Sequence, residues 1–531
     1  MRLPDSAASV GGRVGYRRGG RHREDGPMNP FIERHQEEIA AVLSCFDRVI
    51  ITGTLPEIAH AEAMARYLSK RHIRLFDYPR WAEPLRDGLR QHTQRLAEQV
   101  GLTVEFIRNY RAFRKEARIK DVLAERGEHP GLVHIFSAME ACPSYRPWHD
   151  KSRHRTELKP TGGKCLHYYF YFIDELFGLC YLRVPTWAPF RLQAYFNGHH
   201  WLARRLAKAG IDFQMADNAF VRIAEPKRAQ AMAERLEAKQ LHHRLDRWVK
   251  RLCPVLCQFR SGYHWSFMQV EFATDVIFAR QGYFQPLYEN LIRSAVHSVR
   301  AEHIATFLGR KLTGAYHGEA GNDFSTRIAG TRIRHHMGPA SIKRYDKAAI
   351  MARVECTAND ITFFKHHRWV EHRDGTKQFK LAPLRKSIYS LGDLRKLMRT
   401  ANDRYLRFMA AIDNPDAGLK SIDKMARPAR DKHRSLRGFN LFLAHDYRTM
   451  LTLARGEWAI SGFRAADLRA HVRELSPSRC SYLLKRLRTH GIIKKVGRRY
   501  KYYLTTLGRR VLATALAIRQ FVALPNLVPQ T

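Results

Sequence analysis

Two neighbouring runs of aromatic and aliphatic residues constrain the fold of this chain more than any other feature. Residues 166–173 read Leu-His-Tyr-Tyr-Phe-Tyr-Phe-Ile, and residues 179–184 read Leu-Cys-Tyr-Leu-Arg-Val. The turn residues at 175–178 separate the two runs, which predicts an antiparallel hairpin. Such a hairpin must bury at least one face in a core. Its other face is either more core or a platform on which single-stranded nucleic acid stacks.

The rest of the chain alternates between helical and strand-like patterns. Apolar spacing predicts helices at 32–43, 56–70, 82–99, 112–126, 192–209 and 384–412, and through most of 226–312. Short β-branched runs predict strands at 48–52 and 132–136, and three more within 325–364. We therefore expect an α+β fold, with a mixed helical and antiparallel-sheet body followed by a smaller C-terminal domain.

Composition divides the chain further. Residues 1–27 are rich in Gly and Arg and predict a disordered basic tail, so Met28 is a candidate native start. We expect the body to form an N-terminal domain at 28–225 and a central domain at 226–412. Residues 413–438 carry prolines and many charges and predict a linker, which leaves 439–525 as the C-terminal domain.

The net charge of the chain points to a polyanionic partner. The sequence has 531 residues with 92 Lys and Arg against 50 Asp and Glu, a formal net charge of +42. Nucleic acid is the expected partner, because neutralising phosphates releases counterions. No apolar run reaches the roughly 18–20 residues of a membrane span, so no membrane partner is expected. The eight cysteines are scattered, and the chain starts without an apolar signal segment, so we expect a cytoplasmic protein.

The C-terminal domain carries the most specific pattern. Ser476-Pro477 predicts the start of a helix that ends at Gly491, and a basic hairpin follows at 492–505 with its tip near Gly497. A last helix begins near Thr506. This order resembles the winged helix of MarR-type domains. Residues 457–514 hold fourteen Lys and Arg against three acids, a net charge of +11.

A winged helix places one helix in the major groove of DNA and its hairpin on the backbone. The resemblance implies DNA contacts from Ser478, Arg479, Tyr482, Lys485 and Arg486 on the helix, and from Lys494, Lys495, Arg498, Arg499 and Lys501 on the hairpin. The alternative is a winged helix that binds protein. With this domain, the expected architecture is a basic α+β body followed by a winged helix.

A second pattern lies in the body. Residues 343–347 read Lys-Arg-Tyr-Asp-Lys and are followed by Arg353-Val-Glu355. These strands resemble strands of replication initiators of rolling-circle plasmids and filamentous phages, which implies Tyr345 as a nucleophile and a phosphate-polarising metal. The His-hydrophobic-His pair that holds the metal in those enzymes is not found in this sequence. The alternative is a ladder with cross-strand ion pairs.

Acidic residues supply candidate metal ligands. Glu271 and Asp275 are four apart, which places them on one face of a predicted helix. Glu355 and Asp360 would add ligands if folded nearby, and Asp47 and Asp174 are further scattered acids. Together with Tyr345, the residues Glu271, Asp275 and Glu355 are the catalytic candidates, with Mg²⁺ as cofactor in a nuclease. The alternative for the acids is helix capping or pairing with Arg.

The histidine doublets lie beside Lys and Arg and favour solvated or phosphate-facing side chains over metal ligands. Cys253 and Cys257 have no second pair and are expected to be buried thiols. The sequence has no Walker A, kinase, GxSxG or HExxH pattern, which disfavours NTP-driven and hydrolase functions.

Three functions fit these features. The first is a DNA-binding protein of mobile-element DNA transactions, such as end or origin recognition in transposition or replication initiation. Residues 28–525 as a whole resemble a large bacterial family of proteins associated with mobile elements. The second is a metal- or Tyr-dependent nuclease or transposase. The third is an RNA-binding component of a ribonucleoprotein.

Overall fold

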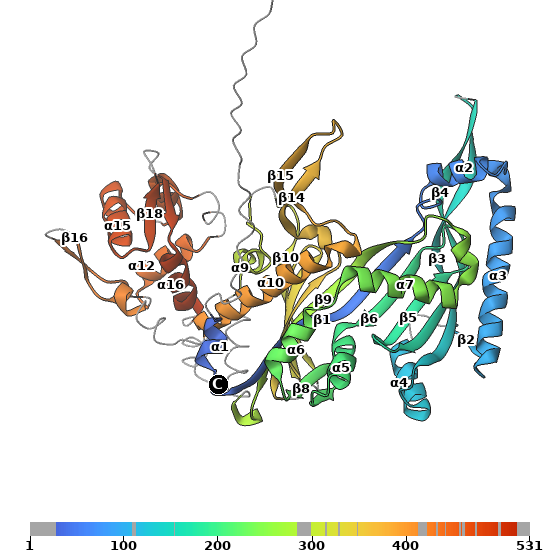
Figure 1. The fold of residues 1–531 in the computed structure, drawn as a ribbon. Helices are drawn as coiled ribbons and strands as arrows, with labels where there is room; N and C mark the ends of the chain where they lie inside the picture. Colours follow the sequence, from blue (N-terminus) through green and yellow to red (C-terminus); the bar gives the residue numbers. More distant parts are fainter. Residues whose placement is uncertain are drawn as a thin grey trace, which may run out of the picture.

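A large antiparallel-rich sheet forms the body of the protein (Figure 1). The computed structural model describes residues 28–108, 113–152, 154–283, 299–313, 316–327, 330–347, 349–412, 422–431, 434–440, 442–455, 458, 462–472, 475–496 and 501–517. The predicted tail at 1–27 lies outside them. The eleven strands follow the order β10-β11-β12-β13-β9-β1-β6-β5-β4-β3-β2. All pairs described in this sheet are antiparallel except β2–β3.

The strands of the sheet are β1 (Ile39–Thr54), β2 (Val104–Phe106), β3 (Gly131–Asp150), β4 (Arg155–Asp174), β5 (Gly178–Pro185), β6 (Leu192–Asn197), β9 (His264–Phe278), β10 (Ala320–Arg327), β11 (Gly330–Met337), β12 (Ala340–Lys347) and β13 (Met351–Ala358). The predicted hairpin at 166–184 is confirmed as β4–β5. Two smaller hairpins flank the sheet: β7 (Phe213–Ala216) with β8 (Ala219–Ile223), and β14 (Lys365–Glu371) with β15 (Lys377–Pro383).

Helices cover the two faces of the sheet unequally. The helices of the body are α1 (Pro30–Arg34), α2 (Ala61–Ser69), α3 (Tyr78–Gln99), α4 (Lys115–Arg126), α5 (Gly198–Lys208), α6 (Pro226–Ala233), α7 (Ala238–Leu252), α9 (Ala301–Phe307) and α10 (Leu391–Ile412). Helices α6, α7 and α10 cross one face (Figure 1), where Trp248 of α7 packs on Phe172 and Asn402 of α10 donates to the Phe272 carbonyl. Helix α4 packs on the other face through Ile119. The mixed α and β body is therefore confirmed.

Three predicted helices contain strands instead. The predicted helix at 32–43 ends at Arg34 and gives way to β1, the one at 192–209 begins with β6, and 264–278 within the predicted helical stretch is β9. Strand β9 pairs on both sides and is buried on both faces along most of its length. In a continuous apolar run, the apolar positions match the spacing of a helix as well as that of a strand, which explains the error.

The body does not divide at the expected boundary between residues 225 and 226. Strand β9 lies between β1 and β13, so segments from both predicted domains share one sheet. The main hydrophobic core extends from Phe31 to Ala410 and includes residues of both predicted domains. Residues 28–412 are therefore described as one unit.

The aromatic hairpin β4–β5 is packed on both faces. Tyr169, Tyr171 and Tyr181 are buried in a second core beneath α4, and Phe170 and Phe172 belong to the main core. Of the two alternatives for the second face, core packing is therefore confirmed and the stacking platform is excluded, because α4 covers the face that would have received the bases.

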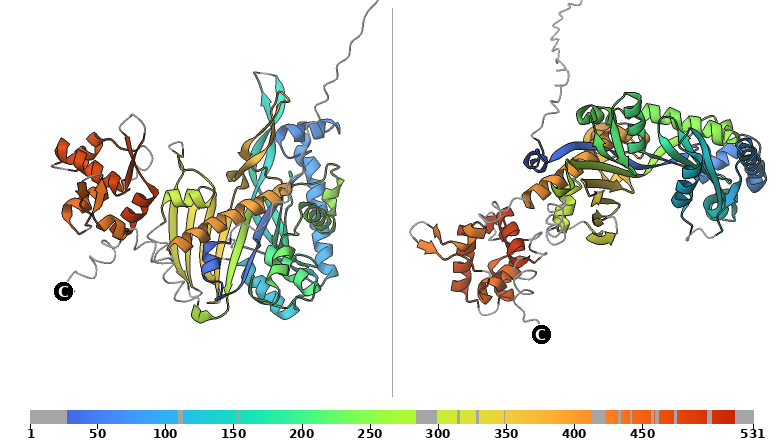
Figure 2. Two further views of the ribbon diagram at one scale, coloured as in Figure 1. Left: turned by 60° about the vertical axis from the view of Figure 1, so that its left-hand side comes forward. Right: turned by 90° about the horizontal axis from the view of Figure 1, so that it is seen from below.

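The C-terminal elements gather around a core of their own and add no described strand to the large sheet (Figure 2). They are β16 (Ala429–Asp431), β17 (Arg434–Leu436), α12 (Ala444–Leu453), α14 (Ala465–His471), α15 (Pro477–Thr489), β18 (Ile493–Val496), β19 (Lys501–Leu504) and α16 (Thr506–Ala517). As predicted, the Ser476 side chain caps α15 by accepting from the Arg479 amide, and Gly491 follows the helix with φ +71°. Part of the predicted linker is structured, since β16 and β17 form a hairpin and Met425 belongs to this core.

No helix in the described residues has the length and apolar composition needed to cross a lipid bilayer. All eight cysteines are free; Cys253 is buried as predicted, whereas Cys257 is exposed.

His335 on β11 gives the body a predicted pH dependence. Its ring nitrogens lie 2.7 Å from Asn322 Oδ1 and 3.3 Å from the Tyr405 hydroxyl, and burial, reinforced by the Arg344 charge, lowers its pKa from 6.5 to about 4. Between these values the unfolded chain binds a proton that the folded chain does not. The free energy of unfolding should therefore fall by up to about 3 kcal/mol as the pH drops from 6.5 to 4.

Urea unfolding at several pH values measures this effect. His335→Gln should flatten the pH dependence in that window, whatever its effect on stability at pH 7. An equally steep pH dependence in the variant would assign the acid sensitivity to other groups.

Candidate functional site

The four catalytic candidates from the sequence lie together on three adjacent strands. Strand β9 carries Glu271 and Asp275, β13 carries Glu355, and β12 carries Tyr345. In the ladder, Arg353 pairs with Asp275 on one side and with Tyr345 on the other. Side chains alternate along a strand, so residues an even number apart share a face. Glu271 and Asp275 thus do share a face, but a strand rather than the predicted helix places them there.

Strand β1 adds Asp47 to this cluster, next to a β-bulge. The β1–β9 register shifts between Phe46 and Val49, so Asp47 and Arg48 together oppose Glu271. The register is regular up to this point, with Leu43 opposite Asp275 and Cys45 opposite Ala273, so Asp47 lies on the face that carries Asp275 and Glu271. Carboxylate oxygens of Asp47, Glu271 and Glu355 all lie within 4.8 Å of one another. We call these three residues the carboxylate triad.

Arg353 joins the triad to Asp275. It is fully buried, donates two hydrogen bonds to Asp275 at 2.6 and 2.7 Å, and donates one to Asp47 at 2.9 Å. Burial raises the pKa of Asp275, but the Arg353 charge and the His199 hydrogen bond outweigh burial and hold this pKa below its usual value. Asp275 is therefore a paired anion that orients Arg353.

His199, at the start of α5, lies between the two aspartates. Its Nε2 is 3.3 Å from Asp275 and its Nδ1 is 3.5 Å from Asp47, where Nδ1 has no hydrogen-bond partner. Asn197 caps α5 and also donates to Asp47 at 2.6 Å, so the end of β6 fixes this carboxylate. Burial raises the pKa of Asp47, but the interaction with His199, the charge of Arg353 and the hydrogen bond from Asn197 outweigh it, so the pKa is lowered.

The other side of the triad is more open and holds a lysine. Lys343 Nζ lies 2.7 Å from Glu271 and 2.8 Å from Glu355, and the Tyr345 hydroxyl donates to Glu355 at 2.6 Å. The Glu271 side chain is 13% exposed and that of Lys343 is 18% exposed, whereas Glu355 is buried. The site is thus reached from solvent past Glu271 and Lys343.

Glu271 is the member of the triad whose ionised form is disfavoured. Burial and the neighbouring Glu355 charge raise its pKa, even though Lys343 opposes the shift. Burial and Glu355 also raise the pKa of Tyr345 well above its ordinary value. A divalent cation would relieve the repulsion between the carboxylates, because hard cations prefer oxygen ligands. The triad offers three such ligands, and Lys343 already places one positive charge among them.

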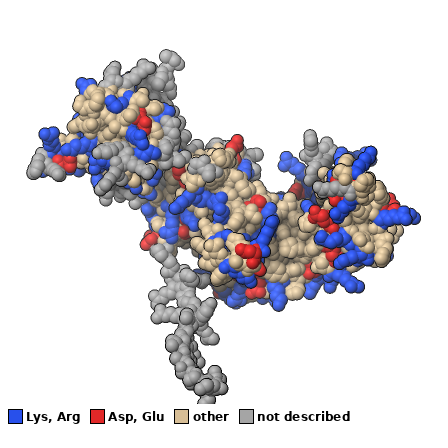
Figure 3. All heavy atoms as spheres, turned by 90° about the horizontal axis from the view of Figure 1, so that it is seen from above, with Lys and Arg blue, Asp and Glu red and all other residues tan. Residues whose placement is uncertain are grey.

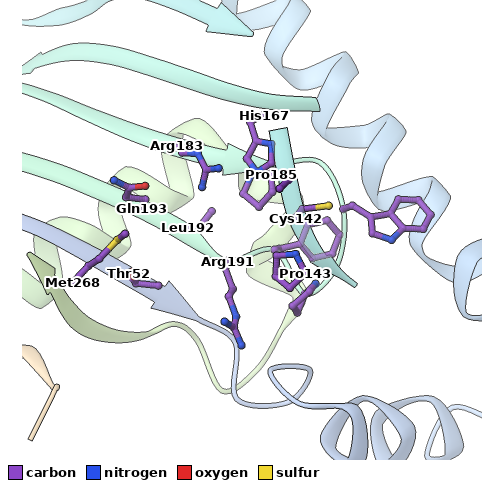
Figure 4. Close-up of a pocket in the computed structure, with 14 residues that line it drawn as sticks. Thr52, Cys142, Pro143, His167, Arg183, Pro185, Arg191, Leu192, Gln193 and Met268 are labelled. Carbon is purple, nitrogen blue, oxygen red and sulfur yellow. The ribbon is translucent and has the colours of Figure 1, made fainter. Parts of the chain in front are cut away.

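A pocket of about 190 Å³ lies farther along the sheet (Figure 4). Thr52 of β1 and Gln193 of β6 line it together with the cationic side chains Arg183 and Arg191. Thr52 follows Asp47 by five residues on the same strand, which corresponds to roughly 16 Å.

Two further acids from the sequence lie in other environments. Asp174 accepts the amides of Leu176 and Phe177 in the β4–β5 turn and pairs with Arg244. Asp360 accepts the Thr362 amide and pairs with Lys386. Neither belongs to the triad.

The predicted DNA-contacting residues of α15 differ in exposure. Ser478, Arg479, Tyr482 and Lys485 are exposed, and Lys485 pairs with Asp431 at 2.7 Å. Arg486 is buried, donates to Asp446 at 3.0 and 3.1 Å and lies over the Phe439 ring. The predicted DNA contact of Arg486 is therefore wrong, because its guanidinium is buried in the C-terminal core and pairs with Asp446 there.

The hairpin residues are only partly described. Lys494 and Lys495 are exposed on β18, and Lys501 is half-buried on β19. Arg498 and Arg499, which were also predicted to contact DNA, lie outside the described residues.

No protein-family model, curated protein or solved structure matches this chain. The interpretation of both regions therefore comes from their own chemistry.

Proposed function

We propose that this protein binds DNA and breaks or transfers a DNA strand at the carboxylate triad with a divalent cation. The observation that carries the proposal is the convergence of Asp47, Glu271 and Glu355 from three strands onto one half-open site. Burying three carboxylates together is costly unless cations compensate them. Lys and Arg spread over the face seen in Figure 3 suit a polyanionic substrate.

The chain's own residues have separate tasks in this proposal. The triad would hold Mg²⁺ or Mn²⁺, and a cation bound there would supply Lewis-acid polarisation of a phosphate. Arg353 and Asn197 keep Asp47 in position, and Lys343 is placed to bind a phosphate oxygen. Tyr345 either orients Glu355 through its hydrogen bond or attacks the phosphate itself. The two roles differ in outcome, since attack by Tyr345 leaves DNA covalently attached to the protein.

The C-terminal unit is proposed to hold duplex DNA as a winged helix. The exposed start of α15 offers Ser478, Arg479 and Tyr482 to base edges, and Lys494 and Lys495 offer charge to phosphates. The net charge of +11 over residues 457–514 supports this role. In this arrangement the C-terminal unit selects an end or origin of a mobile element and the body acts on it.

Cleavage assays on labelled single-stranded and duplex DNA test the proposal. We expect wild-type protein to cleave with Mg²⁺ or Mn²⁺ and to be inactive in EDTA. Glu355→Gln should lower the rate at least about a hundredfold. Glu140→Gln is the matched control, because Glu140 also accepts a tyrosine hydroxyl and pairs with a cation, but lies outside the triad.

Further arms of the same assay separate the two regions. Arg479→Ala should reduce sequence preference in binding without changing metal dependence. Tyr345→Phe should abolish a covalent protein–DNA adduct if Tyr345 is the nucleophile. Metal-independent binding with no cleavage of any DNA by wild-type protein would overturn the catalytic proposal, and selective retention of a structured RNA would favour the ribonucleoprotein alternative.

A further inference from the structure

The hairpin β14–β15 exposes its large apolar side chains to solvent instead of burying them. In the ladder, Trp369 is opposite Phe379 and His367 is opposite Leu381, so the four side chains share one face. Trp369 is 63% exposed, Phe379 57% and Leu381 56%. Residues on the other face, such as Arg368 and Ala382, are less exposed. Antiparallel sheets normally bury the apolar face and expose the polar one.

The exposed rings form a continuous surface. The Trp369 and Phe379 ring centroids are 5.7 Å apart, and the His367 ring stacks on Phe379 at 5.9 Å with an interplanar angle of 23°. The hairpin projects from the body in Figure 1. A contiguous exposed apolar surface on a projecting element is typical of a binding site.

Charge on the hairpin indicates the partner. Residues 365–383 contain five Lys and Arg against two acids, a net charge of +3. Arg368 donates to the carbonyls of Pro383 and Trp369, and Lys365 and Lys377 lie at opposite ends of the aromatic face. Cations beside exposed rings suit phosphates beside bases. A second copy of this chain is disfavoured as the occupant, because both copies carry a strong positive charge.

We propose that the aromatic face of β14–β15 stacks on unpaired bases of single-stranded DNA. Every base offers a flat face to an aromatic ring, so such stacking is tolerant of sequence and is lost when the bases are paired. The inference rests on the nucleic-acid partner proposed above, but not on the cleavage site. It adds that the substrate is at least partly unpaired when the body engages it.

Fluorescence anisotropy in EDTA tests the inference without cleavage. The probes are a labelled 20-nucleotide single strand and the corresponding duplex. The test variant is Trp369→Leu with Phe379→Leu, which keeps apolar cross-strand packing and removes the rings. Phe76→Leu is the matched control, because Phe76 is as exposed as Trp369 but lies between α2 and α3. Trp369→Phe alone keeps a ring at that position and should retain most of the binding.

We expect the double variant to bind the single strand at least about tenfold more weakly and the duplex within about twofold of wild type. Unchanged single-strand affinity, or an equal loss on both probes, would overturn the inference. Binding of single-stranded RNA but not of single-stranded DNA would also overturn it. The same holds if wild-type protein sediments as a dimer and the double variant sediments as a monomer. If wild-type protein binds only duplex, this inference is overturned, while the proposed cleavage of duplex DNA is unaffected. If it binds single strands but shows no metal-dependent cleavage, the cleavage proposal is overturned and this inference is supported.

Discussion

Arg353→Met is expected to lower the free energy of unfolding of the body by about 3–5 kcal/mol. The guanidinium is fully buried and compensates two buried carboxylates, Asp275 and Asp47. Removing the cation leaves two buried anions without their guanidinium partner in a site of low polarity, which costs far more than the pair itself contributes. Urea unfolding followed by tryptophan fluorescence is a suitable measurement, because seven of the eight tryptophans lie in the body.

Arg399→Met provides the matched control for this change. Arg399 also pairs with a carboxylate, Glu234, at 2.6 Å, but it is half exposed. Solvent screens such a pair, so the variant should lose no more than about 1 kcal/mol. A comparable, small loss for both variants would mean that the Arg353 network is much better hydrated than its burial indicates.

Glu271→Gln is expected to stabilise the metal-free protein and to abolish metal-dependent activity. The pKa of Glu271 is raised on folding, so its ionised form at pH 7 opposes folding. A neutral amide of similar size removes that repulsion, and we expect the Tm to rise by about 1–3 °C. The same change removes a carboxylate ligand and should lower cleavage at least about a hundredfold. Such a trade between stability and activity is typical of functional sites.

Thermal unfolding with and without Mn²⁺ measures both parts of this prediction. Mn²⁺ should raise the Tm of wild-type protein and have little effect on Glu271→Gln. Glu140→Gln should instead lower the Tm. Hydrogen bonds from Tyr169 and Arg183 outweigh burial and lower the pKa of Glu140, which makes its ionised form stabilising. A fall in Tm for Glu271→Gln, with no response of wild-type protein to metal, would identify the triad as a structural ion-pair cluster.

Local signals in the sequence predicted the C-terminal elements well. Ser476 and Pro477 define the start of α15 and Gly491 its end, because capping and turn chemistry depend only on neighbouring residues. The hairpin β4–β5 was predictable for the same reason. The burial of Arg486 was not, because it depends on Asp446, which is 40 residues away.

The residue types of the site were predictable, but its assembly was not. Tyr345, Glu271 and Glu355 were identified as candidates, yet nothing in the sequence gives the register that brings β9 beside β13. Asp47 was named only as a further scattered acid, because its place beside Glu271 depends on the pairing of β1 with β9. The charged pair Asp47-Arg48 inside a β-branched run is the one local signal that could have marked the bulge in β1.

The central position of β1 has a consequence for how the protein is made. Its partner β9 follows more than 200 residues later, and the hydrogen bond between Asp47 and Arg353 spans 306 residues of sequence. During synthesis from the N-terminus, the edge of β1 that pairs with β9 therefore has no partner until most of the body has left the ribosome. A truncated or unfinished chain contains Asp47 but lacks Glu355, so it holds no complete triad. If the triad cuts DNA, the cell is exposed to that activity only from chains that have been completed through β13.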